Sequence, residues 1–277
     1  MEKYSVLMSL YKDEKPQNLK VSIQSMLDQT VKPDEIVLVK DGPITEALET
    51  VVSEFVQRFP DLFIIVPLEK NIGLGLALNE GLKHCQNELV ARMDTDDLSL
   101  SDRCEKQLKA FQIEELDIVG TNIDEFIDDP ANIVSSRSLP SEHDEIVRFS
   151  RRRNPFNHPT VMYRKSAVLA NNGYSDYRRN QDMDLFIRML NNGCRAKNIN
   201  ESLLLFRANE DNLKRRKSWT KASSNIVMLY DFWKKGYSGF GDFLIASMSH
   251  LAAFLMPNFI FEKLSKKYLR KSKEDEA

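Results

Sequence analysis

Residues 89–97 read Leu89-Val90-Ala91-Arg92-Met93-Asp94-Thr95-Asp96-Asp97, an apolar segment that ends in a cluster of carboxylates. Like charges this close repel one another, so the cluster must be solvated or neutralised by a cation. Carboxylate oxygens suit the hard ions Mg²⁺ and Mn²⁺, and ligands of α/β sheets bind at the carboxyl ends of strands. The stretch therefore predicts a divalent-metal site formed by Asp94, Asp96 and Asp97. The alternative is a solvated acidic turn that caps the next helix.

Apolar segments and helical periodicities alternate around this stretch. Buried strands are predicted over residues 5–10, 35–39, 63–66, 89–93 and 117–120, with helices between them. The last of these helices extends through Phe111, and Ser99 with Asp102 resembles a capping box for it. This alternation predicts an α/β fold with a mixed, mostly parallel sheet flanked by helices. Asp41 follows the second strand, so we expect it on the same sheet edge as Asp94.

The pattern changes from about residue 122. Residues 124–138 are polar and predict a loop or weak hairpin, and two prolines exclude an α-helix over 151–159. A strand over 160–163, a short helix over 165–171 and a strong helix over 181–190 follow. Asp182 shares a face of the strong helix with Phe186 and Met189. It is either a helix N-terminal charge or a group that faces an internal cleft.

Composition and missing motifs exclude several classes of protein. The chain has 277 residues, with 39 Lys and Arg against 41 Asp and Glu, so its charge does not indicate binding to nucleic acid. The three cysteines are unclustered, which favours reduced thiols in the cytoplasm and excludes a zinc site. The N-terminus is not typical of a signal peptide. Neither GxGxxG nor GxxxxGK[ST] is present, so a dehydrogenase or P-loop NTPase is not supported.

Several segments, in this order, resemble the motifs of the family 2 glycosyltransferases, enzymes of the GT-A fold that use nucleotide-diphospho-sugars. They are residues 6–14, 37–42, 71–81, 92–97, 158–162 and 181–188. Lys40 replaces one Asp of the family's Asp-Asp-Gly motif, and Gln181 replaces the Glu of its Glu-Asp pair. The resemblance covers residues 4–216. Within the family it points to bacterial transferases similar to the amylovoran-type and O-antigen-type galactosyltransferases.

The resemblance implies an inverting transfer of one hexose, with galactose as our guess, from a UDP-sugar. The acceptor would be a saccharide or an undecaprenyl-diphosphate-linked sugar in surface polysaccharide synthesis. Asp96 would be the main ligand of Mn²⁺ or Mg²⁺, with Asp94 and Asp97 beside it, and Asp182 would be the general base. The expected donor-binding residues are Leu10, Tyr11, Asp13, Asp41, Asn71, Gly73, Asn79, Arg92, Asp94, Asp96, Arg215 and Arg216. The expected acceptor-binding residues are His158 and Gln181.

The same resemblance implies a GT-A catalytic domain over residues 1–216, with a nucleotide-sugar half over 1–121 and an acceptor half over 122–216. A helical segment over 217–277 would follow. Residues 243–261 are apolar but interrupted by Ser, His and Pro, so they are too broken for a membrane span. Six basic residues follow between 263 and 273. This pattern favours one of two arrangements. The segment attaches peripherally to the cytoplasmic face of the inner membrane, or its helices pack on the catalytic domain and its basic tail is solvated.

Two other functions compete with the glycosyltransferase. A metal-dependent nucleotidyltransferase or phosphotransferase also uses clustered aspartates, but it would release pyrophosphate or phosphorylate its acceptor. A non-catalytic nucleotide-sugar-binding module would hydrolyse no donor when Mn²⁺ is present. No Gln-x-x-Arg-Trp motif occurs, which disfavours a processive synthase.

Overall fold

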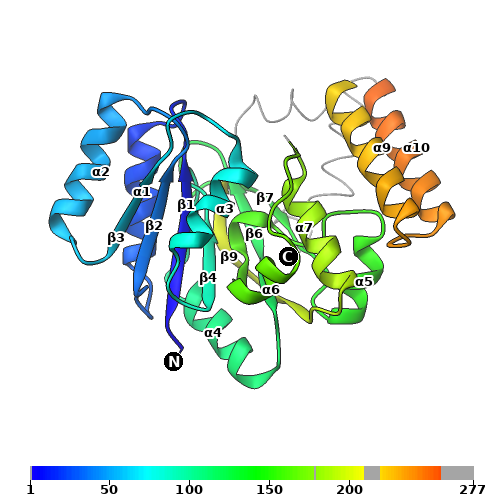
Figure 1. The fold of residues 1–277 in the computed structure, drawn as a ribbon, viewed down its shortest axis with the longest axis horizontal. Coiled ribbons are helices and arrows are strands. Elements are labelled where there is room, and N and C mark those ends of the chain that lie inside the picture. The colour runs from blue at the N-terminus through cyan, green and yellow to red at the C-terminus, as the bar shows by residue number, and fades with distance from the viewer. Residues whose placement is uncertain (1, 178, 209–218, 257–277) are drawn as a thin grey trace.

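The computed structural model describes residues 2–177, 179–208 and 219–256 (Figure 1). In its first half, strands and helices alternate as the sequence predicts. These elements are β1 (Tyr4–Leu10), α1 (Pro16–Leu27), β2 (Glu35–Lys40), α2 (Glu46–Arg58), β3 (Phe63–Pro67), α3 (Leu74–His84), β4 (Leu89–Met93), β5 (Leu98–Ser99) and α4 (Arg103–Ile113). The second half contains β6 (Ile118–Phe126), β7 (Ile133–Arg137), α5 (His143–Ser150), the 3₁₀ turn η1 (His158–Thr160), β8 (Met162–Arg164), α6 (Lys165–Ala170), α7 (Gln181–Asn191), β9 (Ala196–Arg207), α9 (Trp219–Lys234) and α10 (Phe240–Leu255).

The strands form one mixed sheet in the order β3-β2-β1-β4-β8-β6-β9-β5, and β7 pairs with β6 outside this path. Strands β3, β2, β1 and β4 run parallel, and β8 runs antiparallel to both of its neighbours. The predicted α/β fold with a mixed sheet flanked by helices is confirmed, and parallel pairing is confined to β3-β2-β1-β4 and to β6-β9. Because β2 and β4 lie on either side of β1, the residues that follow them, Asp41 and Asp94, lie along the same sheet edge.

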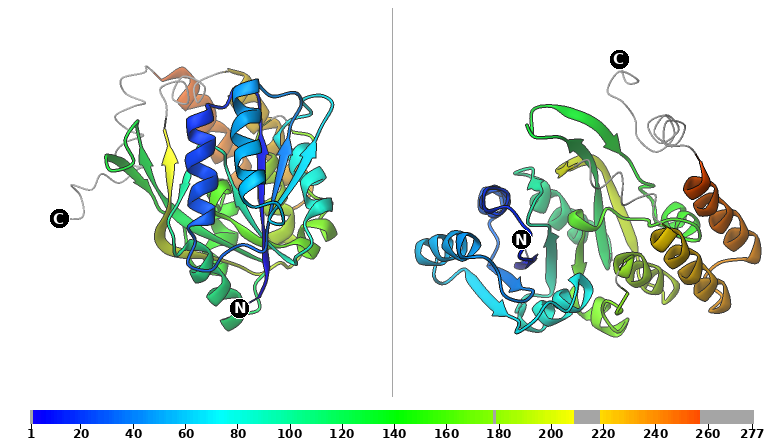
Figure 2. Two further views of the ribbon diagram at one scale, coloured as in Figure 1. Left: turned by 90° about the vertical axis from the view of Figure 1, so that its left-hand side faces the viewer. Right: turned by 90° about the horizontal axis from the view of Figure 1, so that it is seen from above.

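Helices cover both faces of the sheet (Figure 2). Successive β1 residues point to opposite faces, as in any strand. Val6 and Met8 pack in a core with α1, α2 and α4, whereas Leu7 packs in a second core with α3, α6 and α7. Burial on both sides explains why the central strands are continuous apolar runs instead of alternating ones.

The predicted capping box before α4 is wrong. Ser99 lies in β5, which pairs with β9, and its hydroxyl accepts a hydrogen bond from the Gln29 amide at 3.1 Å. The helix begins after Asp102, whose side chain caps no backbone N–H and instead pairs with Lys106 at 2.8 Å. Tertiary contacts of Ser99 therefore replace the local cap that the sequence favoured.

The second half agrees only in part with the sequence prediction. Residues 124–138 form a hairpin, one of the two predicted alternatives, because β6 continues to Phe126 and pairs with β7. The strand predicted from residue 160 begins instead at Met162, because Thr160 lies in η1. Strand β9 was not predicted, since its first half is polar and its pairing partner β6 is distant in sequence. This strand matters for function because it ends at Arg207, beside the acidic cluster.

The C-terminal helices α9 and α10 contact each other and pack on α7. Met228, Leu229 and Phe232 of α9 form a small core with Met183 and Ile187 of α7. Among the described helices, none combines the length and apolar character needed to cross a bilayer. The domain division at residue 216 remains a prediction.

Candidate active site

The three predicted metal ligands lie together where β4 ends. Asp94, Asp96 and Asp97 each offer a carboxylate oxygen, and these oxygens lie within 4.8 Å of one another. The turn that carries them is held from α1, where the Ser22 hydroxyl donates to the Asp94 carbonyl at 2.6 Å. Three carboxylates in one turn form the hard, oxygen-rich set that Mg²⁺ or Mn²⁺ prefers.

Asp97 supplies an independent indication that a cation fits this site. Its side chain is fully buried, and its Oδ1 accepts a hydrogen bond from the Arg207 backbone N–H at 2.9 Å. Its Oδ2 is buried and has no hydrogen-bond partner among the described residues. Burial and the neighbouring carboxylates raise the pKa of Asp97 well above its usual value. A buried carboxylate oxygen without a partner is costly, and a bound cation would remove that cost.

Asp96 lies in a similar electrostatic environment. Burial, then the charge of Asp94, then that of Glu14 raise the pKa of Asp96 to about 7. Glu14 comes from the loop before α1, and its carboxylate accepts from the Thr95 hydroxyl at 3.1 Å. It therefore adds a fourth negative charge beside the predicted ligands. Sequence reasoning did not assign it a role, because its neighbourhood depends on the β1–β4 pairing.

A buried arginine balances this negative charge. Arg92 is 1% exposed and forms an ion pair with the Asp94 carboxylate. Burial disfavours the charged guanidinium, but the attraction of Asp94, with smaller contributions from Tyr174 and Asp97, outweighs it, so the pKa of Arg92 is raised. Its Nε and Nη1 find no hydrogen-bond partner among the described residues. Arg92 therefore depends on Asp94 for compensation of its charge.

Arg92 also links the acidic cluster to the predicted general base. Burial is the main cause that raises the pKa of Asp96, Asp97 and Asp182, and the positive charge of Arg92 offsets part of each rise. Since Coulomb interactions fall with distance, both groups of carboxylates lie within electrostatic range of this one guanidinium. The structure thus brings Asp182 and the acidic cluster to the same region of the fold.

Asp182 lies in the first turn of α7. Its Oδ2 accepts a hydrogen bond from the Asn154 side-chain amide at 2.6 Å, and burial raises its pKa. A raised pKa makes a carboxylate a better proton acceptor near neutral pH. Nothing in the sequence around Asn154 indicated this contact, because the segment before it is an arginine-rich loop.

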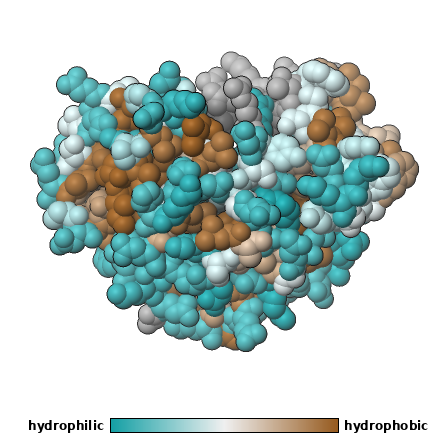
Figure 3. Space-filling view, in the orientation of Figure 1, coloured by the Kyte–Doolittle hydropathy of each residue, from teal (hydrophilic) through white to brown (hydrophobic). Residues whose placement is uncertain are grey.

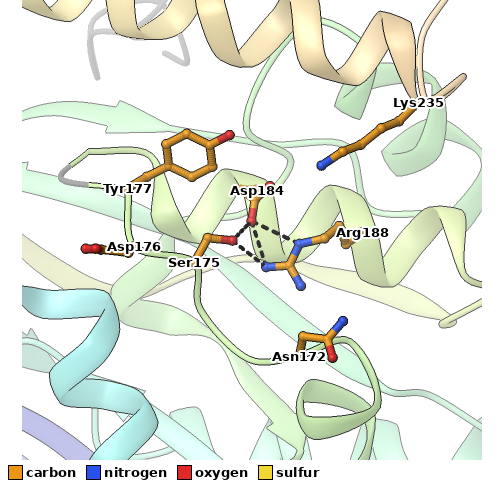
Figure 4. A pocket seen from close by; sticks show the side chains of 7 residues that line it. All are labelled: Asn172, Ser175, Asp176, Tyr177, Asp184, Arg188 and Lys235. Carbon is orange, nitrogen blue, oxygen red and sulfur yellow. Dashed lines mark hydrogen bonds and ion pairs between the residues drawn. The ribbon is translucent and has the colours of Figure 1, made fainter.

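The start of α7 is fixed by a buried ion pair (Figure 4). Arg188 donates to Asp184 through Nε at 2.9 Å and Nη2 at 2.7 Å, and the Ser175 hydroxyl donates to the same carboxylate. Arg188 also donates to the Gly173 carbonyl at 2.8 Å. These bonds tie the loop over residues 171–175 to the helix that carries Asp182.

The two predicted acceptor-binding residues are mostly buried. His158 is 9% exposed, its Nε2 lies 3.0 Å from the Tyr174 hydroxyl, and its ring packs on Phe186. Burial and the charge of Arg92 lower its pKa well below 6.5, so the imidazole is neutral. Gln181 is 8% exposed, and its Oε1 has no partner within the described part of the chain. Their contact with an acceptor remains a prediction.

Asp41 organises the predicted nucleotide side of the site. Its carboxylate accepts from the Asn71 amide at 2.7 Å and from the backbone N–H groups of Ile72 and Gly73 at 2.8 and 3.2 Å. Gly42 has a φ of +86°, and a Cβ there would lie 2.6 Å from the Asn71 nitrogen. The turn therefore requires glycine, and it brings Asp41, Asn71 and Gly73 together as predicted.

The other predicted donor-binding residues are spread more widely. The Leu10 side chain is fully buried in the core, so only its backbone could line a site. Tyr11 and Asp13 are exposed in the loop after β1. Asn79 is engaged by the backbone of Tyr174, with bonds of 2.7 and 2.8 Å. Arg215 and Arg216 lie outside the described residues.

Comparison with known proteins assigns this chain to a family. Residues 5–172 match the sequence profile described as glycosyl transferase family 2. The chain therefore belongs to the family 2 glycosyltransferases, and it is a transferase with the GT-A fold.

Particular relatives span nearly the whole chain. The amylovoran biosynthesis glycosyltransferase AmsE of Erwinia amylovora is 37% identical over 265 residues, which is 94% of this chain and 98% of that protein. The UDP-Gal:alpha-D-GlcNAc-diphosphoundecaprenol beta-1,3-galactosyltransferase of Escherichia coli is 32% identical over 272 residues, 96% of this chain and 98% of that one. The mannosyltransferase PcManGT of Pyrobaculum calidifontis, solved with GDP-Man and Mn²⁺, has a TM-score of 0.64 at 15% identity and covers 95% of this chain and 73% of its own.

Binding of Mn²⁺ should depend on pH. The pKa of Asp96 is raised to about 7, so the folded, metal-free protein favours the protonated carboxyl group. This group therefore stabilises the metal-free fold at low pH, and that stabilisation is lost as pH rises through about 7. Metal binding requires the deprotonated carboxylate, so apparent Mn²⁺ affinity should be about ten-fold weaker at pH 6 than at pH 8. Titration calorimetry or the Mn²⁺-induced rise in Tm at both pH values measures this. Equal affinity at the two values, or an unchanged Mn²⁺ response in D96N/D97N, would contradict it.

Loss of Arg92 should destabilise the fold. Arg92→Leu leaves the Asp94 carboxylate without its buried partner, and breaking such a pair costs about 3–5 kcal/mol. Urea unfolding measures this cost. Arg195→Leu is the matched control, because Arg195 is exposed. Equal stability of the two variants would show that the pair does not hold the site together.

Proposed function

We propose that this chain transfers one hexose from a UDP-sugar to a hydroxyl group of a lipid-linked or oligosaccharide acceptor in bacterial surface polysaccharide synthesis. The arrangement that carries the proposal is the acidic cluster and Asp182 placed around Arg92 in a family 2 glycosyltransferase. The names of the E. amylovora and E. coli relatives support the polysaccharide context and a lipid-linked acceptor. Galactose is the sugar that the E. coli relative's name suggests.

The donor would bind beside the acidic cluster. Asp96, Asp94 and Asp97 would hold Mn²⁺ or Mg²⁺, which when bound supplies a Lewis acid that neutralises the leaving diphosphate. The loop built on Asp41 would hold the nucleoside. Arg92 forms an ion pair with the Asp94 carboxylate and so orients it.

Asp182 would act on the acceptor. Its Oδ2 accepts a hydrogen bond from Asn154, which orients the carboxylate that would take the proton. The acceptor O–H bond breaks toward Asp182 as the acceptor oxygen forms a bond to the anomeric carbon. The bond from that carbon to the diphosphate oxygen breaks on the opposite face, and the nucleoside diphosphate leaves with the electron pair. This single displacement inverts the anomeric configuration.

The competing functions differ in their products. A nucleotidyltransferase would release pyrophosphate, whereas this proposal requires release of a nucleoside diphosphate. Family membership favours sugar transfer, and no feature of the described residues specifically favours the nucleotidyltransferase or a non-catalytic module. A panel of nucleotide sugars tested for Mn²⁺-dependent release of nucleoside diphosphate identifies the donor.

Replacement of Asp182 should separate chemistry from binding. Asp182→Asn keeps the shape of the side chain but cannot accept the proton, so turnover should fall by about 10²–10⁴-fold with little change in UDP affinity. Turnover of sugar transfer and calorimetric binding of UDP with Mn²⁺ measure the two effects. Asp61→Asn, an exposed change remote from the site, is the control. Unchanged turnover in Asp182→Asn would remove this residue from the mechanism.

We further propose that α10 lies against the inner membrane. Its apolar side chains recur every three or four residues on one exposed face and are 39–69% exposed: Phe240, Leu244, Met248, Leu251 and Leu255. No Asp, Glu, Lys or Arg occurs between Phe243 and Leu255. Part of this apolar surface is visible at the upper right of Figure 3. The basic sequence after residue 262 would add attraction to anionic lipids.

Charged substitutions on this face should weaken membrane binding. L244E/M248E places two carboxylates where we propose lipid contact, so co-sedimentation with phosphatidylglycerol-containing vesicles should fall several-fold. The control I113E/L169E makes the same chemical change at exposed apolar residues on α4 and α6. If both variants co-sediment with the vesicles as strongly as the wild type does, the proposed lipid contact is rejected.

A further inference from the structure

A second charged region lies outside the acidic cluster and carries the opposite sign. A groove of about 750 Å³ opens at the end of α5. The residues that line it are Pro140, Glu145, Arg148, Phe149, Arg151, Arg152, Arg153 and Asp242. Four arginines face two carboxylates there, so the groove has an excess of positive charge. The sequence interpretation gave these arginines no role.

Only part of this positive charge is neutralised within the protein. Arg152 pairs with Asp242 of α10 at 2.6 Å. Across residues 2–177, 179–208 and 219–256, no such pair forms at Arg148, Arg151 or Arg153. The Arg153 guanidinium lies 5.1 Å from the centre of the Phe149 ring, and burial lowers its pKa. Arg148, Arg151 and Arg153 are exposed, so these cations without a carboxylate partner are accessible to an external anion.

The position of the groove relates it to the acceptor side of the site. Arg153 is followed directly by Asn154, whose amide holds the Asp182 carboxylate. Asp242, in the first turn of α10, also lines the groove. The exposed apolar face of α10 begins at Phe240, two residues before it. The groove thus adjoins, through neighbouring residues, both the candidate base and the proposed membrane face.

We propose that Arg148, Arg151 and Arg153 bind the diphosphate of an acceptor in which a sugar is joined through that diphosphate to a polyprenyl chain. Arginine forks match phosphate oxygens in pairs of parallel hydrogen bonds. The sugar end would then extend toward Asp182, and the lipid would follow the apolar face of α10. This assignment rests on the proposed function, and it names the acceptor class for the same site.

Direct binding to the full-length chain tests the groove. Farnesyl diphosphate is titrated by calorimetry in a buffer with EDTA, which prevents metal-mediated binding at the acidic cluster. R148Q/R151Q/R153Q should bind it at least ten-fold more weakly than the wild type. K20Q/R58Q/R195Q, which removes three exposed charges elsewhere, should bind like the wild type. Triple lysine replacement of the groove arginines should restore only part of the affinity, since charge returns without the fork geometry.

Several outcomes overturn the proposal. Equal affinity of R148Q/R151Q/R153Q and wild type for farnesyl diphosphate does so, as does equally tight binding of farnesol. If R148Q/R151Q/R153Q loses as much affinity for inorganic phosphate or for phosphatidylglycerol vesicles as it loses for farnesyl diphosphate, the groove is a general anion surface. That result also rejects the assignment.

Catalysis separates this proposal from the proposed function. The experiment compares the KM values of two acceptors that carry the same N-acetylglucosamine on the same farnesyl chain, one with the diphosphate and one without it. The wild type should use the diphosphate acceptor with a KM at least ten-fold lower, and R148Q/R151Q/R153Q should lose that preference. Absence of Mn²⁺-dependent UDP release by the wild type would reject the proposed function, whereas transfer to both acceptors with equal KM would reject only the diphosphate site.

Discussion

The ion pair between Arg92 and Asp94 is the interaction on which the site depends. A guanidinium buried beneath the end of β4 needs a carboxylate within reach, and Asp94 is the one that meets it. That pairing fixes the turn from which Asp96 and Asp97 project. The same positive charge acts on Asp182 from the other half of the fold. One buried cation thus contributes to the electrostatics of both halves of the site, and the Asp94 carboxylate offsets its cost of burial.

Rigid contacts position the other side chains around this pair. The Asp41 carboxylate is saturated by the loop before α3, and the Asp184–Arg188 pair fixes the loop before α7 to that helix. Tyr174 connects α3 with the 3₁₀ turn η1. Its backbone N–H donates a hydrogen bond to the Asn79 side chain of α3, and its hydroxyl lies within hydrogen-bond distance of His158 in η1. Such supporting contacts keep reacting groups in place without contacting the substrates themselves.

Charge is segregated across the fold, although the chain is nearly neutral overall. Acidic side chains gather at the carboxyl end of β4, and arginines gather at the end of α5. The first region suits a cation that accompanies a donor diphosphate, and the second suits an anion that arrives without a metal. A net charge of −2 conceals this separation, because opposite clusters cancel in the total.

The sequence alone determined the alternating α/β order, the parallel sheet edge with Asp41 and the acidic turn, and the helix that carries Asp182. These features are local: each depends on apolar runs, periodicity or adjacent carboxylates. Only the tertiary structure decided that Ser99 joins a strand, that β9 pairs with β6 and brings Arg207 to Asp97, and that Asn154 meets Asp182. Those contacts join residues far apart in the chain, and no local pattern encodes them. The arginine groove likewise takes Asp242 from α10, which forms an ion pair there with Arg152.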